Sequence, residues 1–223
     1  MRINQYIASA TAISRRMADK LISDGKVSVN NNVAQIGQTI NSSDKVKVDG
    51  REISLKPTTT TLILNKPTGF VVSRNGQGCQ TIYDILPENY HHLKPVGRLD
   101  KDSCGLLLLT DDGELANQLT HPKFQKRKVY NIKLDKPLSR SDLEKINSGL
   151  RVQNYISHLH LSSISPDGLK WKVEMSEGKN RQIRNTLATA GYRVIRLERV
   201  AFGDFLLGDL KPGQHREHKF SNK

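Results

Sequence analysis

Residues Gly97–Gly113 read GRLDKDSCGLLLLTDDG, a polar turn followed by the run of four leucines from Leu106 to Leu109. A short apolar run bounded by turn residues is typical of a strand that is buried on both faces. The turn before the run carries a carboxylate, Asp100, beside a cation, Arg98. A charged group next to a buried strand is held in a fixed, partly dry place, which suits chemistry. The alternative is a solvated loop that happens to carry Arg and Asp.

The chain as a whole is strongly basic, with 223 residues, a net charge of +13 and a pI of about 9.8. This length allows one domain or two. The positive excess is spread along the sequence, which favours a polyanionic partner with a long footprint, because each neutralised phosphate adds electrostatic affinity. An anionic membrane surface is the competing partner. We expect no membrane partner, because no stretch reaches 18 apolar residues and no basic amphipathic helix with aromatic anchors is visible.

The two cysteines, Cys79 and Cys104, are too few and too isolated for a disulfide framework or a zinc site. Cys104 precedes Gly105 and invites a reading as a nucleophile, but no histidine follows it in a catalytic pattern. We therefore expect Cys104 to be a small buried residue.

The histidine pairs, His91–His92 and His158 with His160, have no cysteine or carboxylate partner at a metal-ligand spacing, so we predict no metal site. No apolar signal peptide follows Met1, and we expect a cytoplasmic protein.

The first fifty residues predict two helices followed by a small twisted sheet. Ile3, Ile7 and Ala10 have helical spacing, and Ser14 is a candidate N-cap for a second helix over residues 15–23. On that helix we expect Met17, Leu21 and Ile22 to face inward. Valines then alternate with polar residues between turns rich in Asn, Asp and Gly, which is the pattern of short strands.

Basic side chains gather on this second helix and just after it, at Arg15, Arg16, Lys20 and Lys26. A charge cluster can be a solvated face or a phosphate-contact surface. Residues 1–55 resemble the S4-type RNA-binding domain through Ser14-Arg15-Arg16, the stretch LISDGKVSV at 21–29, Asn30 and Val33. The resemblance implies that these four basic residues contact RNA phosphates, which position a protein without reading sequence.

Residues 56–61 have the composition of a linker, and residues 62–223 predict a second, larger domain. Strand patterns occur at 62–64, 70–72, 106–109, 126–134, 170–175 and 192–202, and helix patterns at 114–119, 139–146 and 180–190. There is no regular alternation of strand and helix. We therefore expect an α+β fold, with a mixed, mainly antiparallel sheet flanked by helices.

Three further segments of this domain carry polar groups suited to chemistry. They are KPTGFVVS at 66–73, KRKVY at 126–130 and EGKNRQIRN at 177–185. If the last segment is helical, Arg181 and Arg184 share one side of the helix, while Ile183 and Leu187 share another. A helix start that carries Lys and Arg suits an anionic ligand.

Together and in this order, the four segments closely resemble pseudouridine synthases of the ribosomal type with an N-terminal S4 domain. The resemblance runs from about Ile3 to Pro212, with Lys101 to Cys104 in the variable middle of the first motif. It implies an enzyme that isomerises a uridine in ribosomal RNA to pseudouridine. No atom is gained or lost, so no redox cofactor is required, and we take a monomer as the default.

The resemblance also implies roles for individual residues. Breaking the bond between ribose and base needs a nucleophile or a negative charge, and Asp100 matches that residue. Arg184 matches the arginine that pairs with the catalytic carboxylate, and Tyr130 matches the tyrosine that packs on the target base. The uridine must leave its stack to react. Leu187 is a candidate to line the base pocket, and the remaining RNA-contact candidates are Arg98, Lys66, Lys179 and Arg181.

The stretches at 12–16 and 81–84 favour the large ribosomal subunit over the small one as the target. Two rival functions stay open. One is an RNA-binding assembly factor without catalysis, which the retained Asp, Tyr and Arg disfavour. The other is a hydrolase acting on nucleosides, which would usually want paired carboxylates.

Overall fold

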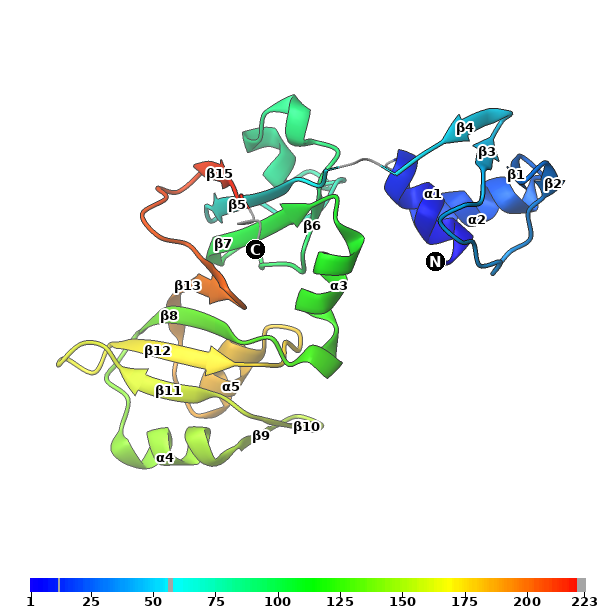
Figure 1. Ribbon diagram of the computed structural model, residues 1–223. Coiled ribbons are helices and arrows are strands. Elements are labelled where there is room, and N and C mark those ends of the chain that lie inside the picture. Colours follow the sequence, from blue (N-terminus) through cyan, green and yellow to red (C-terminus); the bar gives the residue numbers. More distant parts are fainter. Residues whose placement is uncertain (12, 56–57, 220–223) are drawn as a thin grey trace. The chain divides into compact units, whose positions relative to one another are not determined.

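The computed structural model describes residues 1–11, 13–55 and 58–219, and the chain divides into two compact units (Figure 1). The first unit comprises residues 1–60 with Asp111–Gly113, and the second comprises the rest. Ala12, in the stretch used to favour the large subunit, and Lys56–Pro57 of the expected linker lie outside the described residues.

The first unit contains two helices and a four-stranded antiparallel sheet, as the sequence predicts. Helix α1 spans Ile3–Thr11 and α2 spans Arg15–Ser23; the strands are β1 (Val27–Val29), β2 (Asn32–Val33), β3 (Val46–Val48) and β4 (Arg51–Ile53), in the order β2-β1-β3-β4. Ser14 caps α2, and its Oγ accepts a hydrogen bond from the Met17 amide. Side chains from both helices and from the sheet form the core of this unit.

The inward face of α2 differs from the prediction at one position. Ala18 and Ile22 are buried, whereas Met17 is 48% exposed. Residues 18 and 22 are one helical turn apart and define the buried stripe, which turns Met17 toward solvent.

The second unit is built on a nine-stranded sheet, with the central order β11-β12-β8-β13-β7-β5-β15 (Figure 1). Strand β14 pairs with β13, and β6 pairs with β7. Strands β13 and β7 are parallel, and the other described pairs are antiparallel, which confirms the mixed sheet. The strands are β5 (Thr61–Lys66), β6 (Lys94–Pro95), β7 (Cys104–Thr110), β8 (Lys128–Leu134), β11 (His160–Ser163), β12 (Lys170–Met175), β13 (Val194–Phe202), β14 (Phe205–Leu206) and β15 (His215–Glu217).

Three helices accompany this sheet: α3 (Gly113–Thr120), α4 (Arg140–Ser148) and α5 (Gln182–Thr189). A separate hairpin of β9 (Leu150–Val152) and β10 (Tyr155–Ser157) follows α4, and short 3-10 turns lie at Ile82–Ile85, Glu88–Tyr90 and Pro122–Phe124. Helix α5 begins two residues later than expected, because Arg181 has a left-handed backbone with a φ of 47°. The expected strand over 70–72 is reduced to one bridge between Val71 and Thr81.

Strand β7 is buried on both faces, as the leucine run predicts. Leu107 and Leu109 pack into the larger core of the unit, while Leu106 and Leu108 pack into a second cluster around Phe202. Complete burial of each leucine contributes about 1.5–3 kcal/mol. The alternation therefore anchors β7 between two apolar layers and fixes the turn that precedes it.

Thr61, which the sequence places in the linker, is the first residue of β5 and is 1% exposed. Its Oγ1 lies 3.0 Å from Thr110 Oγ1 on β7. A β-branched residue fits a pleated, buried strand well, which explains the difference.

Gly105 permits the close approach of β7 and β13. Its φ is +99°, and a Cβ there would lie 2.3 Å from the carbonyl oxygen of Arg199.

We expect Gly105→Ala to destabilise the protein by about 3 kcal/mol or more, from backbone strain and overpacking. Denaturant unfolding measures this. Gly113→Ala is the matched control, since its Cβ would meet nothing within 4 Å. Equal midpoints for the two variants would contradict the account.

Candidate active site

The second unit contains a cavity of about 860 Å³ at the turn before β7. It is lined by that turn, the segment that enters β8, the segment between β12 and α5, and part of β13. Six of the predicted site residues share this lining: Arg98, Asp100, Tyr130, Lys179, Arg181 and Arg184. The structure thus brings together groups that lie more than 80 positions apart in the chain.

Lys66 fixes the turn that carries Asp100 by hydrogen bonds to its main chain. Its ammonium donates to the carbonyl oxygens of Pro67 at 3.0 Å, Asp100 at 3.0 Å and Ser103 at 2.7 Å. The side chain is completely buried at the end of β5. Three backbone acceptors use all three ammonium donors, so the main chain of the turn is fixed while its side chains stay free to face the cavity.

This burial corrects the prediction that Lys66 contacts RNA. Lys66 is 0% exposed and points into the protein, where it positions the turn. Burial lowers its pKa to about 8, and Coulomb interactions with Cys104, Asp100 and Asp102 oppose that change. The sequence alone gave no sign of this, since a lysine that ends a strand usually reaches solvent.

The two carboxylates of the turn share two arginines of the α5 segment. Arg181 makes two hydrogen bonds to Asp102, both 3.0 Å, and its Nη1 lies 3.4 Å from Asp100 Oδ2. Arg184 Nε lies 3.3 Å from Asp102 Oδ2, and its Nη2 donates to the Asp102 carbonyl at 2.9 Å. The ion pair described for Asp100 is therefore with Arg181, not with the expected Arg184.

Asp102 is the residue that sequence reasoning missed. Hydrogen bonds from Arg181 and the charges of Arg184 and Arg181 lower its pKa, against the opposing effect of burial. It lies in the part of the first motif that was treated as variable. Its only sequence signal is its place two residues after Asp100, where a turn brings both carboxylates to the same arginines.

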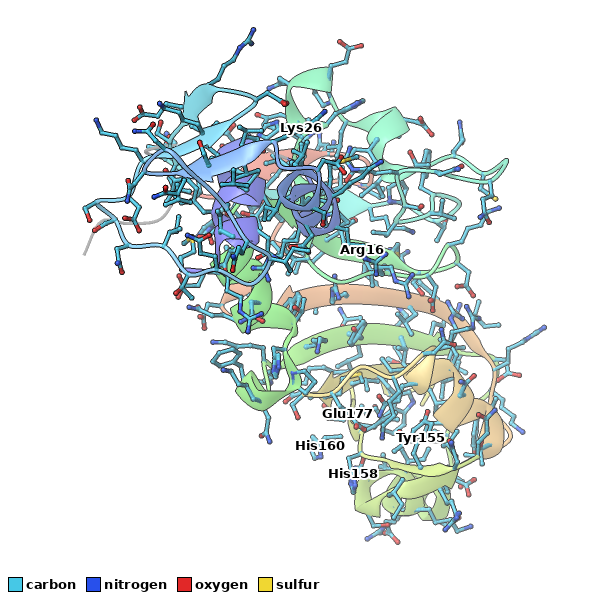
Figure 2. All side chains as sticks on the ribbon, turned by 90° about the vertical axis from the view of Figure 1, so that its right-hand side faces the viewer. Arg16, Lys26, Tyr155, His158, His160 and Glu177 are labelled. Atoms are coloured by element: carbon cyan, nitrogen blue, oxygen red, sulfur yellow. The ribbon has the colours of Figure 1, made fainter. Side chains whose placement is uncertain are left out.

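The segment before α5 is tied down by a polar cluster around Glu177, which Figure 2 labels with Tyr155 and His158. Glu177 accepts hydrogen bonds from the Gln182 side chain and the His158 amide, and pairs with Lys179 at 3.1 Å. Lys179 also lies over the ring of Tyr155, 4.1 Å from its centroid. These contacts fix the start of α5 and so the arginines that follow it.

Tyr130 and Leu187 have different places in the site. Tyr130, on β8, is 8% exposed and lines the cavity. Leu187 is 0% exposed and packs in the core, and the lining of this cavity does not include it, so its contact with the base stays a prediction. Ile183, one turn earlier on α5, lines the cavity instead. Both residues are buried and lie one turn apart on the inner face of α5.

The four basic residues of the first unit are exposed. Arg15, Arg16 and Lys20 lie on α2, and Lys26 precedes β1; Figure 2 labels Arg16 and Lys26. Exposure leaves them accessible to a polyanion, which is what the S4 resemblance requires of them.

The part of the chain that the structure describes lacks two kinds of feature. That part holds no group of three or more His, Cys, Asp or Glu side chains placed to hold a metal ion. It also contains no helix with the length and apolar character needed to cross a membrane.

Comparison with known proteins matches residues 60–189 to the family described as RNA pseudouridylate synthase and residues 1–46 to the S4 domain. The chain belongs to the RNA pseudouridylate synthase family. It is 34% identical to an "Uncharacterized RNA pseudouridine synthase" of Aquifex aeolicus, over 97% of this chain and 90% of that protein.

Two more relatives extend the comparison. The chain is 33% identical to "Ribosomal large subunit pseudouridine synthase B" of Bacillus subtilis, over 97% of this chain and 91% of that protein. A solved structure titled "Crystal structure of pseudouridylate synthase" is similar with a TM-score of 0.69 and 27% identity, covering 98% of this chain and 96% of that one. Family members are isomerases that act on uridine in RNA, so the enzyme class and the fold class predicted from the sequence are both confirmed.

The low pKa of Lys66 predicts a specific pH dependence of stability. Between about pH 8 and 10.5 the unfolded chain binds the Lys66 proton and the folded chain does not, so the cost of burying Lys66 falls as the pH rises. We expect wild type to gain up to about 3 kcal/mol of unfolding free energy relative to Lys66→Met between pH 7 and 10.5. Urea unfolding of both proteins across this range measures the difference. Parallel curves would contradict it.

Proposed function

We propose that this enzyme converts a uridine of large-subunit ribosomal RNA to pseudouridine, with Asp100 as the residue that acts on the ribose. The observation that carries the proposal is the shared cavity, in which Asp100, Tyr130 and two arginines meet within the family-matched region. The large-subunit assignment is supported by relatives named for that activity in Bacillus subtilis and Pseudomonas aeruginosa.

The reaction breaks the bond between ribose C1′ and N1 of uracil, turns the base, and joins C1′ to C5. The proton that leaves C5 is balanced by one gained at N1, so the product is an isomer of the substrate. The sugar carries positive character when the first bond breaks, and a carboxylate can stabilise it by charge or by attack. Asp100 supplies that carboxylate, either by attacking C1′ or by taking a proton from C2′.

The arginines and Tyr130 complete the proposed machinery. Arg181 and Arg184 supply positive charge that keeps the carboxylates of the turn ionised when bound RNA excludes water. Tyr130 offers a ring face on which uracil can stack and a hydroxyl that can relay a proton. The target nucleotide is flipped out of its helix to enter the cavity, and the exposed Arg98 takes the space it leaves or holds the backbone beside it.

The first unit holds the RNA in this proposal. Arg15, Arg16, Lys20 and Lys26 contact phosphates of folded ribosomal RNA and leave the choice of uridine to the second unit. A ribosomal substrate places the enzyme in the cytoplasm, and we propose that it acts as a monomer.

Asp100 and Asp102 lie on the same turn, so a variant of each tests which of the two carboxylates is catalytic. We expect Asp100→Asn to abolish isomerisation while RNA affinity is largely kept. Asp102→Asn is the matched control, and it should keep measurable turnover because Asp102 contacts arginines and lies outside the cavity lining. Incubation with unmodified 16S and 23S ribosomal RNA, followed by chemical mapping of pseudouridine, measures both.

Turnover by Asp100→Asn close to wild type would remove Asp100 from the mechanism. Intact RNA binding with no new pseudouridine from the wild-type protein would favour the assembly-factor function. Release of free uracil would favour the hydrolase.

The salt dependence of RNA affinity tests whether the first unit contacts RNA phosphates. We expect Arg15→Gln with Arg16→Gln to weaken RNA binding and to lower the slope of log affinity against log salt by about 1.5, since two phosphate contacts are lost. Lys45→Gln with Arg51→Gln removes the same charge from two exposed positions of the same unit, one just before β3 and one on β4. Equal slopes for the two double variants would rule out a dedicated contact surface on α2.

A further inference from the structure

Arg199 is a buried cation that the proposed chemistry does not use. It lies on β13, is 2% exposed and belongs to the cavity lining. Its Nε donates to the Leu106 carbonyl at 2.7 Å. Its Nη2 is shielded from solvent and has no hydrogen-bond acceptor among the described residues. A buried guanidinium with an unused donor carries a positive charge that the described residues leave partly uncompensated.

A second cation, Lys128 on β8, lies beside it. The Lys128 ammonium is 5.2 Å from the centroid of the Phe202 ring, and the Arg199 guanidinium carbon is 4.9 Å from the same centroid. Lys128 also lines the cavity. Burial lowers its pKa first and repulsion from Arg199 lowers it further, while Glu177 acts in the opposite direction. The two positive charges therefore face one end of the cavity together.

Nearby acidic groups do not neutralise this pair. Lys128 reaches Glu177 only through the backbone carbonyl, at 3.3 Å. The Glu177 carboxylate is engaged by Lys179, the Gln182 side chain and the His158 amide. Asp100 has its described ion pair with Arg181. Two cations in a poorly solvated setting without a carboxylate of their own attract an anion strongly.

We propose that Lys128 and Arg199 form a binding site for one phosphodiester of the RNA, next to the nucleotide in the cavity. This rests on the proposed function for the identity of the RNA. Lys128 contacts the phosphate directly, and the buried Arg199 supplies a second positive charge close to it. A phosphate fits better than a uracil carbonyl, because a neutral oxygen cannot balance two buried positive charges.

The site has a consequence for the reaction. A phosphodiester held at Lys128 fixes the backbone on one side of the flipped nucleotide, so the ribose presents C1′ to Asp100 in one orientation. Such a contact uses the RNA backbone and adds no preference for sequence. It would also raise affinity in a salt-dependent way.

The test is a binding cycle that combines a protein variant with a backbone change in the RNA. The protein variant is Lys128→Gln, since Arg199 also makes a structural hydrogen bond to β7. Lys133→Gln is the control, because Lys133 lies on the same strand with an exposed side chain away from the cavity. The RNA is the 23S fragment that wild type binds most tightly, prepared with a single uncharged methylphosphonate at each position in turn.

We expect Lys128→Gln to weaken binding about tenfold, and one methylphosphonate position to weaken wild-type binding to a similar extent. The two changes should not add when combined, since they remove the same contact, whereas Lys133→Gln should add to every position. Circular dichroism and thermal unfolding check that both variants fold.

Additive losses at every position, or wild-type affinity in Lys128→Gln, would overturn the phosphate site. Conversion of uridine is read separately in the same samples. Coupled binding losses without conversion would support the phosphate site and count against the proposed function. Conversion without coupling would do the reverse.

Discussion

The buried ammonium of Lys66 is the contact on which the geometry of the site depends. It joins β5 to the turn before β7 through the carbonyl oxygens of Pro67, Asp100 and Ser103. The Asp100 side chain remains 38% exposed above this anchor. The main chain is thus rigid while the carboxylate stays accessible, which is the arrangement a preorganised catalytic group needs. The burial of β7 between two apolar layers keeps the anchor in place.

The two carboxylates of the turn differ in how many contacts they make with the arginines. Asp102 takes two hydrogen bonds from Arg181 and an ion pair from Arg184, whereas Asp100 has one described ion pair, at 3.4 Å. Asp102 holds the arginines near the cavity, and Asp100 keeps lone pairs available for its proposed role in the reaction. Because both arginines come from the start of α5, the polar cluster around Glu177 controls where this charge lies.

The sequence predicted those features of the fold that depend on local residue patterns. The leucine run predicted a strand buried on both faces, Ser14 predicted the start of α2, and the strand pattern at 126–134 predicted β8. Family resemblance singled out Asp100, Tyr130 and Arg184, which share the lining of the cavity.

Tertiary contacts decided the rest, and these leave no local signal. The burial of Lys66 depends on three carbonyls, two of them more than 30 residues away. The left-handed backbone at Arg181 shifted the start of α5, and Leu187 went into the core because the helix packs along its whole inner face. The sequence places Arg199 in a predicted strand, but its neighbouring residues give no sign that its side chain is buried.

A map of pseudouridine across 16S and 23S ribosomal RNA gives the sharpest test of a catalytic Asp100 held by this turn. The map compares a strain that lacks the protein with the same strain producing either wild type or Asp100→Asn. The account predicts that one or a few uridines of 23S RNA lose their modification in the first strain, regain it with wild type, and stay unmodified with Asp100→Asn. Identical maps in all three strains, or full restoration by Asp100→Asn, would contradict it.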